Sequence, residues 1–199
     1  RADLSGNGLR GIAKGFFMGS AVSKFEFNVE TDVGSRFIKI EETGVVENGF
    51  TVAAEIGEAS LIELLKSDRF EESQVIRAAK VDIGNPHLIV EVENFDDFEI
   101  EEFAIRENEK ASPIGINVHL IKVDDSSNIS MRHWERGVGT TEACGTGACA
   151  GVFVASEWGQ TESVVNVHMP GGSGRVSIGQ SITLSGPAVF IDKHTVDNG

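Results

Sequence analysis

Two short segments of the chain share one pattern: a small hydroxyl or thiol residue, a glycine, a polar residue and a second glycine. The first is Ser5-Gly6-Asn7-Gly8, and the second is Cys144-Gly145-Thr146-Gly147. Each precedes a stretch rich in small apolar residues with helical periodicity, residues 9–18 and 148–158. Because an internal repeat is typical of duplicated folding units, the sequence predicts two pseudo-equivalent domains that face one another.

Short segments with near-alternating polarity, rich in β-branched and aromatic residues, accompany these two helices. Such segments are typical of strands. They cover residues 25–29, 37–41, 50–56, 88–92, 117–123, 129–133, 164–168 and 182–184. Helical periodicity is also present at residues 60–67 and 95–106. The sequence therefore predicts a mixed α/β protein.

The first predicted domain is incomplete. Arg1 lies only four residues before Ser5, so no strand of this sequence can precede the first glycine pattern. A helix that starts there still needs a sheet on which to pack. We therefore expect either that upstream residues are missing from the sequence or that the first domain is a remnant.

The composition favours a folded protein that binds a small molecule. With 40% hydrophobic residues, the 199 residues can bury one substantial core or two small ones. The formal net charge of −14 argues against nucleic acid or an anionic membrane as partner, because both are polyanions. The sequence has no apolar run of membrane-spanning length and no secretory signal, and its two cysteines are too few for a disulfide framework. We therefore expect a cytoplasmic protein.

The segment Gly6-Asn7-Gly8-Leu9-Arg10-Gly11 matches the dinucleotide fingerprint G-x-G-x-x-G. The fingerprint needs a preceding strand, which is missing here, so a tight turn into a helix explains the segment better. A third interpretation is that glycines at a helix N-terminus leave backbone N–H groups free to hold an anion, which the helix dipole also favours. Two such helix starts could hold one carboxylate between them.

Cys144 is the strongest candidate for chemistry. It directly precedes the second helix, and a helix N-terminus lowers a thiol pKa from about 8.5 toward neutrality. We expect a base or nucleophile, and the competing interpretation is a buried packing cysteine. Cys149 lies about one turn into the helix and is predicted to pack in the core. Without nearby histidines this pair is a poor zinc site, so no metal is predicted.

Two polar motifs lie at predicted strand ends. In Gly84-Asn85-Pro86-His87 the proline restricts Asn85 to extended geometry, which presents Asn85 and His87 at the end of a strand. The alternative is a structural turn histidine. Glu135 and Arg136 follow another strand and place a carboxylate and a guanidinium near Cys144. Here the alternative is a surface ion pair.

Other motifs carry less information. Met169-Pro170-Gly171-Gly172 is predicted to be a hairpin turn. His119, His133 and His168 fall in predicted strands without the spacing of metal ligands, and no role is assigned to them.

In their order and spacing, several motifs together resemble the diaminopimelate epimerase family, over almost the whole chain except the family's opening segment. They are Gly84-Asn85-Pro86-His87, Ile116-Asn117-Val118, Trp134-Glu135-Arg136-Gly137-Val138-Gly139, Ala143-Cys144-Gly145-Thr146-Gly147-Ala148-Cys149-Ala150, Met169-Pro170-Gly171-Gly172 and Ser185-Gly186-Pro187-Ala188.

The resemblance implies two pseudo-symmetric α/β domains, each with a sheet wrapped around a central helix, and an active site in the cleft between them. We place one domain at residues 1–48 with 186–199 and the other at residues 49–185. In the family, one cysteine removes the α-proton of an amino acid as thiolate while a second returns a proton as thiol, without a cofactor or metal. The implied partner is thus a small amino acid, and a homodimer is one option for the assembly.

The resemblance also implies roles for particular residues, carried over by position. Its catalytic positions are Cys144, Ser5, His87 and Glu135. Its substrate-binding positions are Gly6, Asn7, Asn85, Asn117, Arg136, Gly145 and Thr146.

The chain departs from the family pattern at three positions. Ser5 replaces one of the two catalytic cysteines, Thr140 replaces a glutamate, and Gly11 stands where many relatives have a further cysteine. A hydroxyl is far less acidic than a thiol, so Ser5 cannot share the two-base task equally near neutral pH.

Three functions are therefore open. The first is epimerisation of LL- and meso-diaminopimelate in lysine biosynthesis, impaired by Ser5. The second is a paralogous racemase or hydroxyproline-type isomerase, in which a serine–cysteine pair can work. The third is a degenerate protein that binds an amino acid without turning it over.

Overall fold

The computed structural model describes residues 24–31, 34–42, 49–96 and 98–189, together with Gly8 and Gly11. Ser5, Gly6 and Asn7 lie outside the described residues, as does most of the helix predicted at residues 9–18. The described elements are β1 (Lys24–Thr31), β2 (Gly34–Glu42), β3 (Gly49–Gly57), β4 (Ser60–Lys66), η1 (Ser67–Arg69), β5 (Val75–Asp82), β6 (Pro86–Val92), α2 (Ile100–Lys110), β7 (Asn117–Asp125), β8 (Asn128–Glu135), β9 (Gly139–Thr141), α3 (Gly145–Glu157), β10 (Val164–Met169), β11 (Gly172–Ile178) and β12 (Ile182–Val189).

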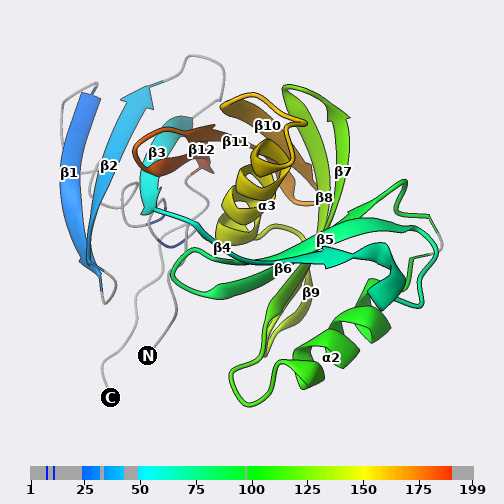
Figure 1. Cartoon of the computed structure of the whole chain (residues 1–199). Coiled ribbons are helices and arrows are strands. Elements are labelled where there is room, and N and C mark those ends of the chain that lie inside the picture. The colour runs from blue at the N-terminus through cyan, green and yellow to red at the C-terminus, as the bar shows by residue number, and fades with distance from the viewer. Residues whose placement is uncertain are drawn as a thin grey trace.

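One long, curved sheet organises the described part of the chain (Figure 1). Its strand order is β1-β2-β3-β12-β11-β10-β8-β7-β6-β5-β4, with β9 paired to β8. The pairs β6–β7 and β8–β10 are parallel, and the other described pairs are antiparallel. The mixed α/β class predicted from the sequence is confirmed.

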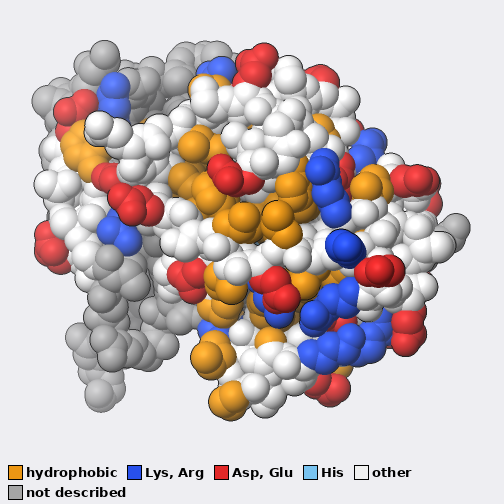
Figure 2. Space-filling model, in the orientation of Figure 1, with side chains coloured by type: hydrophobic (Ala, Val, Ile, Leu, Met, Phe, Trp, Pro, Cys, Tyr) orange, Lys and Arg blue, Asp and Glu red, His pale blue; other side chains and the backbone are white. Residues whose placement is uncertain are grey.

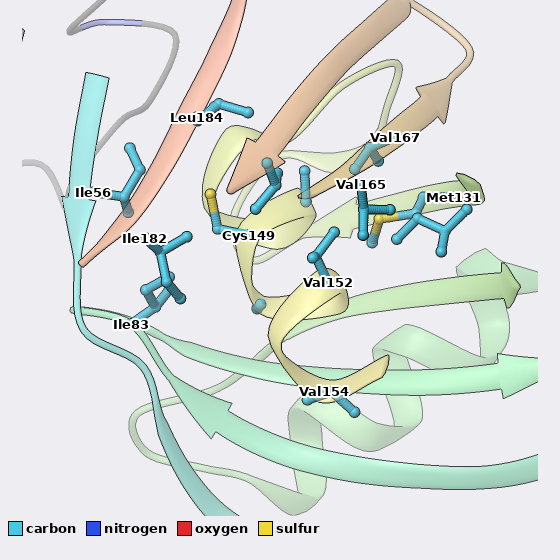
Figure 3. Close-up of a cluster of buried hydrophobic side chains, with 14 of the residues drawn as sticks. Ile56, Ile83, Met131, Cys149, Val152, Val154, Val165, Val167, Ile182 and Leu184 are labelled. Carbon is cyan, nitrogen blue, oxygen red and sulfur yellow. The ribbon is translucent and has the colours of Figure 1, made fainter. Parts of the chain in front are cut away.

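Helix α3 lies inside the curve of this sheet and packs against β5 to β8 and β10 to β12. Its residues from Gly145 to Val152 are all buried, because small side chains let the surrounding strands approach on every side. Figure 3 shows Cys149, Val152 and Val154 of α3 among buried side chains of the strands, including Ile182 and Leu184. The prediction that Cys149 packs in the core is confirmed, since its exposed fraction is 0%.

Helix α2 covers another part of the sheet and packs against β7, β8 and β9. A second core cluster lies beneath it and includes Phe103, Leu120 and Trp134. The sequence placed this helix at residues 95–106, whereas it runs from Ile100 to Lys110. Just before the helix, the side chain of Asn94 accepts a hydrogen bond from the Asp96 N–H at 3.0 Å. This local side-chain bond competes with helix formation.

The helix predicted at residues 60–67 is wrong. The segment forms β4, which pairs with β5 at the end of the sheet order. Pairing with β5 satisfies its backbone groups, and this tertiary context overrides a weak helical preference. The hairpin turn at Met169-Pro170-Gly171-Gly172 is confirmed, because Met169 and Gly172 face each other where β10 and β11 meet.

The surface mixes charge signs even though the net charge is strongly negative. On the face in Figure 2, basic side chains gather on one side with acidic side chains beside them. Two of the ion pairs are Lys80 with Glu63 at 2.9 Å and Lys110 with Glu107 at 2.6 Å. No helix among the described residues is long and apolar enough to cross a membrane.

Candidate active site

The sheet topology brings the predicted polar residues to one end of three neighbouring strands. Strands β6 and β7 run parallel, and His87 near the start of β6 pairs with Asn117 at the start of β7. Strand β8 runs antiparallel to β7 and ends there, at Glu135. Residues separated in sequence by about fifty positions therefore meet at one edge of the sheet.

Cys144 stands at the start of α3, next to this edge. Its backbone is extended (φ −129°, ψ 113°), and its sulfur accepts a hydrogen bond from the Gly147 N–H at 3.4 Å. The hydroxyl of Thr146 lies 3.6 Å from the same sulfur. Cys144 therefore occupies the N-cap position, where side-chain acceptors stabilise the first turn of a helix.

The expectation of a low thiol pKa is wrong for this structure. Burial, and then the negative charge of Glu135, raise the pKa of Cys144 to about 12. The bonds from Thr146 and Gly147 act in the opposite direction but are weaker. Loss of water around the sulfur thus outweighs the helix terminus. Cys144 is a neutral thiol near neutral pH, the form that can donate a proton.

Glu135 is held close to this thiol by a neighbouring strand. The hydroxyl of Thr141, on β9, donates a hydrogen bond to its carboxylate at 2.6 Å. Thr140, which replaces the glutamate of the family pattern, donates to Glu101 on α2 at 2.6 Å. The alternating directions of β9 side chains thus fix one carboxylate near the site and tie the strand to α2.

Replacing Glu135 by glutamine should lower the pKa of Cys144, because it removes a negative charge that opposes the thiolate. We expect alkylation of Cys144 by iodoacetamide at pH 8 to become faster by up to about tenfold. The measurement uses Cys149→Ala chains, so that only one thiol reports. Glu142→Gln is the control, since Glu142 is close in sequence and exposed. An unchanged or slower rate for Glu135→Gln would contradict this account.

Asn117 joins three segments of the edge. Its side-chain oxygen accepts from the Arg136 N–H at 3.0 Å, and its nitrogen donates to the Pro86 carbonyl at 3.1 Å. The guanidinium of Arg136 donates to the carbonyl of Ile114. Because a primary amide has two donors and two lone pairs, Asn117 keeps one of each for a ligand.

Three histidines form a buried hydrogen-bonded chain beside these residues. Nδ1 of His87 lies 2.8 Å from Nε2 of His119, and Nδ1 of His119 lies 2.9 Å from Nδ1 of His133. At the other end, Nε2 of His87 lies 2.9 Å from the side-chain oxygen of Asn85. All three histidines have an exposed fraction of 0%. Burial lowers the pKa of His87 to about 3 and that of His133 to about 4, and it holds the pKa of His119 well below its usual value.

His119 and His133 lack the spacing of metal ligands, yet the sequence contains a signal for their contact. Both residues lie seven positions from Ser126, one before it and one after it. A hairpin centred on Ser126 therefore pairs them, as β7 and β8 do. Equal spacing on either side of a turn therefore indicates ring–ring contact across a hairpin, even where it does not indicate metal binding.

The structure thus collects Asn85, His87, Asn117, Glu135, Arg136 and Cys144 at one edge of the sheet, with Gly145 and Thr146 in the first turn of α3. The remaining predicted site residues, Ser5, Gly6 and Asn7, lie outside the described residues. The edge combines an acid, hydrogen-bond donors and the positive end of a helix dipole. Such a set can hold an anionic ligand and move a proton.

Known proteins resemble this chain in sequence and in fold. Residues 79–191 match the family model described as diaminopimelate epimerase. The diaminopimelate epimerase of Desulfitobacterium hafniense is 33% identical over 205 residues, which cover 96% of this chain and 72% of the relative. That of Methanothermobacter thermautotrophicus is 32% identical over 209 residues, with the same coverage.

Two solved structures show the same fold at low identity. A hydroxyproline epimerase from Agrobacterium vitis superposes with a TM-score of 0.71 at 12% identity, covering 95% of this chain and 66% of that one. A predicted epimerase from Pseudomonas aeruginosa superposes with a TM-score of 0.67 at 16% identity, covering 93% and 73%. Together with the sequence matches, they show that this chain belongs to the diaminopimelate epimerase family of isomerases.

Proposed function

We propose that the chain interconverts LL- and meso-diaminopimelate by proton transfer at the α-carbon, at a rate that Ser5 lowers. The observation that carries the proposal is Cys144, a buried thiol at the N-terminus of α3, beside the polar edge formed by β6, β7 and β8. The proposed place of the reaction is lysine biosynthesis in the cytoplasm, without pyridoxal phosphate or another cofactor. We also propose that residues 1–48 with 186–199 form one domain and that residues 49–185 form the other.

The substrate α-carboxylate would bind at the start of α3. The first N–H groups of a helix have no intrahelical acceptor, and the helix dipole attracts an anion. In α3 these N–H groups belong to Gly145 and Thr146, while the Gly147 N–H is used by Cys144. Gly6 and Asn7 would supply the matching donors from the other side of the cleft. Donors placed in this way also stabilise the negative charge that develops when the α-proton leaves.

Cys144 and Ser5 would then act on opposite faces of the α-carbon. In one direction Ser5, a poor base, slowly takes the α-proton, and the Cys144 thiol gives its proton to the opposite face, leaving a thiolate. In the reverse direction that thiolate takes the α-proton, and the Ser5 hydroxyl returns a proton to the opposite face. The neutral thiol of Cys144 suits the first task, whereas the second requires stabilisation of a buried thiolate by Thr146, Gly147 and the substrate ammonium.

Asn85, Asn117 and Arg136 would recognise the substrate, and Asn117 and Arg136 would meet its far end. Diaminopimelate carries a second amino-acid group, whose carboxylate matches a guanidinium and amide donors. His87 and Glu135 would assist proton transfer. Both lie at the same edge as Cys144, and Glu135 acts directly on the charge state of its thiol.

Replacing Cys144 by alanine should abolish both inversion of diaminopimelate and exchange of its α-hydrogen with deuterated water. The loss should be at least about 10²-fold, the lower end of what one positioned acid or base contributes. Cys149→Ala removes the other thiol and should keep most of the activity. Stereoisomers and deuterium content are measured by chromatography and mass spectrometry.

The outcomes separate the remaining functions. Turnover of hydroxyproline but not of diaminopimelate would overturn the proposed substrate and favour the paralogous isomerase. Binding of diaminopimelate by calorimetry, without exchange or inversion in the unchanged chain, would favour a non-catalytic protein. Equal activity of the Cys144→Ala and Cys149→Ala chains would overturn the role of Cys144.

A further inference from the structure

The buried chain of histidines has one favoured direction of hydrogen bonding. A neutral imidazole has one N–H donor and one bare acceptor nitrogen. Because the Asn85 oxygen accepts from Nε2 of His87, Nδ1 of His87 is an acceptor and must receive a proton from Nε2 of His119. Nδ1 of His119 is then an acceptor and receives from Nδ1 of His133. The direction is set from one end of the chain to the other.

The opposite direction is less favourable. It requires the Asn85 amide to turn over and every ring to exchange its donor and acceptor. The chain would then end on an N–H at Nε2 of His133, an atom that is buried and has no partner among the described residues. In the favoured direction the same atom is a bare nitrogen. Buried N–H groups without acceptors are rarer than under-used acceptors, so the favoured direction has the lower energy.

The surroundings restrict movement of the middle ring. A Cβ atom added at Gly147 would lie 2.5 Å from Cε1 of His119, so the ring packs directly against the first turn of α3. His87 also contacts it, with ring centroids 5.0 Å apart, and His133 meets it edge to face, also at 5.0 Å. His119 thus cannot rotate without displacing its neighbours.

The free end of the chain reaches solvent. Asn85 is 8% exposed, and its side-chain nitrogen makes no hydrogen bond to the described residues and is not buried. With its oxygen held by His87, the amide presents N–H donors to any ligand at the edge. A carboxylate oxygen can accept from these donors, whereas an ammonium group cannot.

We propose that His119 is a positioning residue, which holds His87 in the tautomer with its proton on Nε2 and so fixes the Asn85 amide as a donor to a substrate carboxylate. The proposal rests on the proposed function of this site and adds the part played by residues that do not touch the substrate. His133 completes the arrangement by supplying the proton that Nδ1 of His119 accepts.

The direct test is NMR of the whole chain with ¹⁵N-labelled histidine at pH 7.5. We expect His87 and His119 to carry the proton on Nε2 and His133 to carry it on Nδ1. His168, which is exposed on β10, gives a reference signal that His168→Asn identifies. A proton on Nδ1 of His119, or a charged ring in the chain, would overturn the proposal even if every variant failed to fold.

Two variants extend the test to the ligand. His119→Leu removes both hydrogen bonds of His119, so His87 should show a mixture of tautomers. The KM for diaminopimelate should rise by at least about tenfold, because losing one hydrogen bond to a charged group weakens binding by about that factor. His119→Gln keeps one donor and one acceptor and should restore much of both readouts. Unchanged tautomers and KM in His119→Leu would overturn the positioning role. Absence of turnover in the unchanged chain, with the tautomers as assigned, would overturn the proposed function while supporting the hydrogen-bond direction.

Discussion

Replacing Ser5 by cysteine should raise the two-way rate of epimerisation by about 10²–10⁴-fold. A serine hydroxyl is far less acidic than a thiol, so near neutral pH it provides no useful base to remove the α-proton. Cysteine at this position would restore a group that can exist as thiolate. The rate is measured from both stereoisomers of diaminopimelate, by following the other stereoisomer as it forms.

Isotope exchange gives the matched control for Ser5. With serine present, the stereoisomer that presents its α-proton to Cys144 should exchange with deuterated water faster than it inverts, because Thr146, Gly147 and the substrate ammonium would stabilise the Cys144 thiolate once the substrate is bound. The other stereoisomer should do neither appreciably. Ser5→Ala should behave like the serine form. If the serine form already inverts both stereoisomers at the rate of the Ser5→Cys form, the two-base account is wrong.

Lowering the pH from 7 to 5 should remove about 4 kcal/mol of the free energy of unfolding through His87 and His133 alone. The folded-state pKa values of these residues are lowered to about 3 and about 4, whereas the unfolded chain takes up protons near 6.5. The unfolded state therefore binds more protons in this window, and stability falls as the pH falls. Each residue contributes about 2 kcal/mol, and His119 adds to the effect in the same direction.

Guanidinium unfolding at pH 7 and pH 5 measures this change. A chain with both His119→Gln and His133→Gln keeps only His87 of the three and should lose roughly half of the pH dependence or more. His168→Asn, which changes an exposed histidine outside this chain of three, is the matched control. Hydrogen bonds from Ser130 to Asp124 and from Ser127 to Asp125 lower the pKa values of these carboxyl groups, so their contribution to stability is lost mainly at more acidic pH. Equal pH dependence with and without His119 and His133 would contradict the prediction.

The polarity patterns of the sequence predicted those strands and helices whose structure is determined by nearby residues. The strands at residues 117–123 and 129–133 and the helix at residues 148–158 lie within β7, β8 and α3 or differ by one residue. The failure at residues 60–67 has a different cause. The segment Ser60–Lys66 has hydrophobic residues that fit a helix, and only the neighbouring strand β5 decides between the two structures.

The position of Cys144 could be predicted from the sequence, but its electrostatics could not. The glycine pattern located Cys144 at the start of a helix, as the structure shows. The sign of its pKa shift depends on how much water surrounds the sulfur and on the distance to Glu135, and neither quantity is local in the sequence. One of the two partners of His87, His119, likewise comes from a strand 32 positions away along the chain.

The close contact between Gly147 and His119 links the two halves of the site mechanically. The N–H of Gly147 holds the Cys144 sulfur, and the atoms that would touch its Cβ belong to the ring that holds His87. A sideways displacement of α3 by a fraction of an ångström would therefore disturb the thiol and the imidazoles together. How far the reacting sulfur can move and how far the substrate-orienting amide can move then both depend on how firmly α3 packs on the sheet.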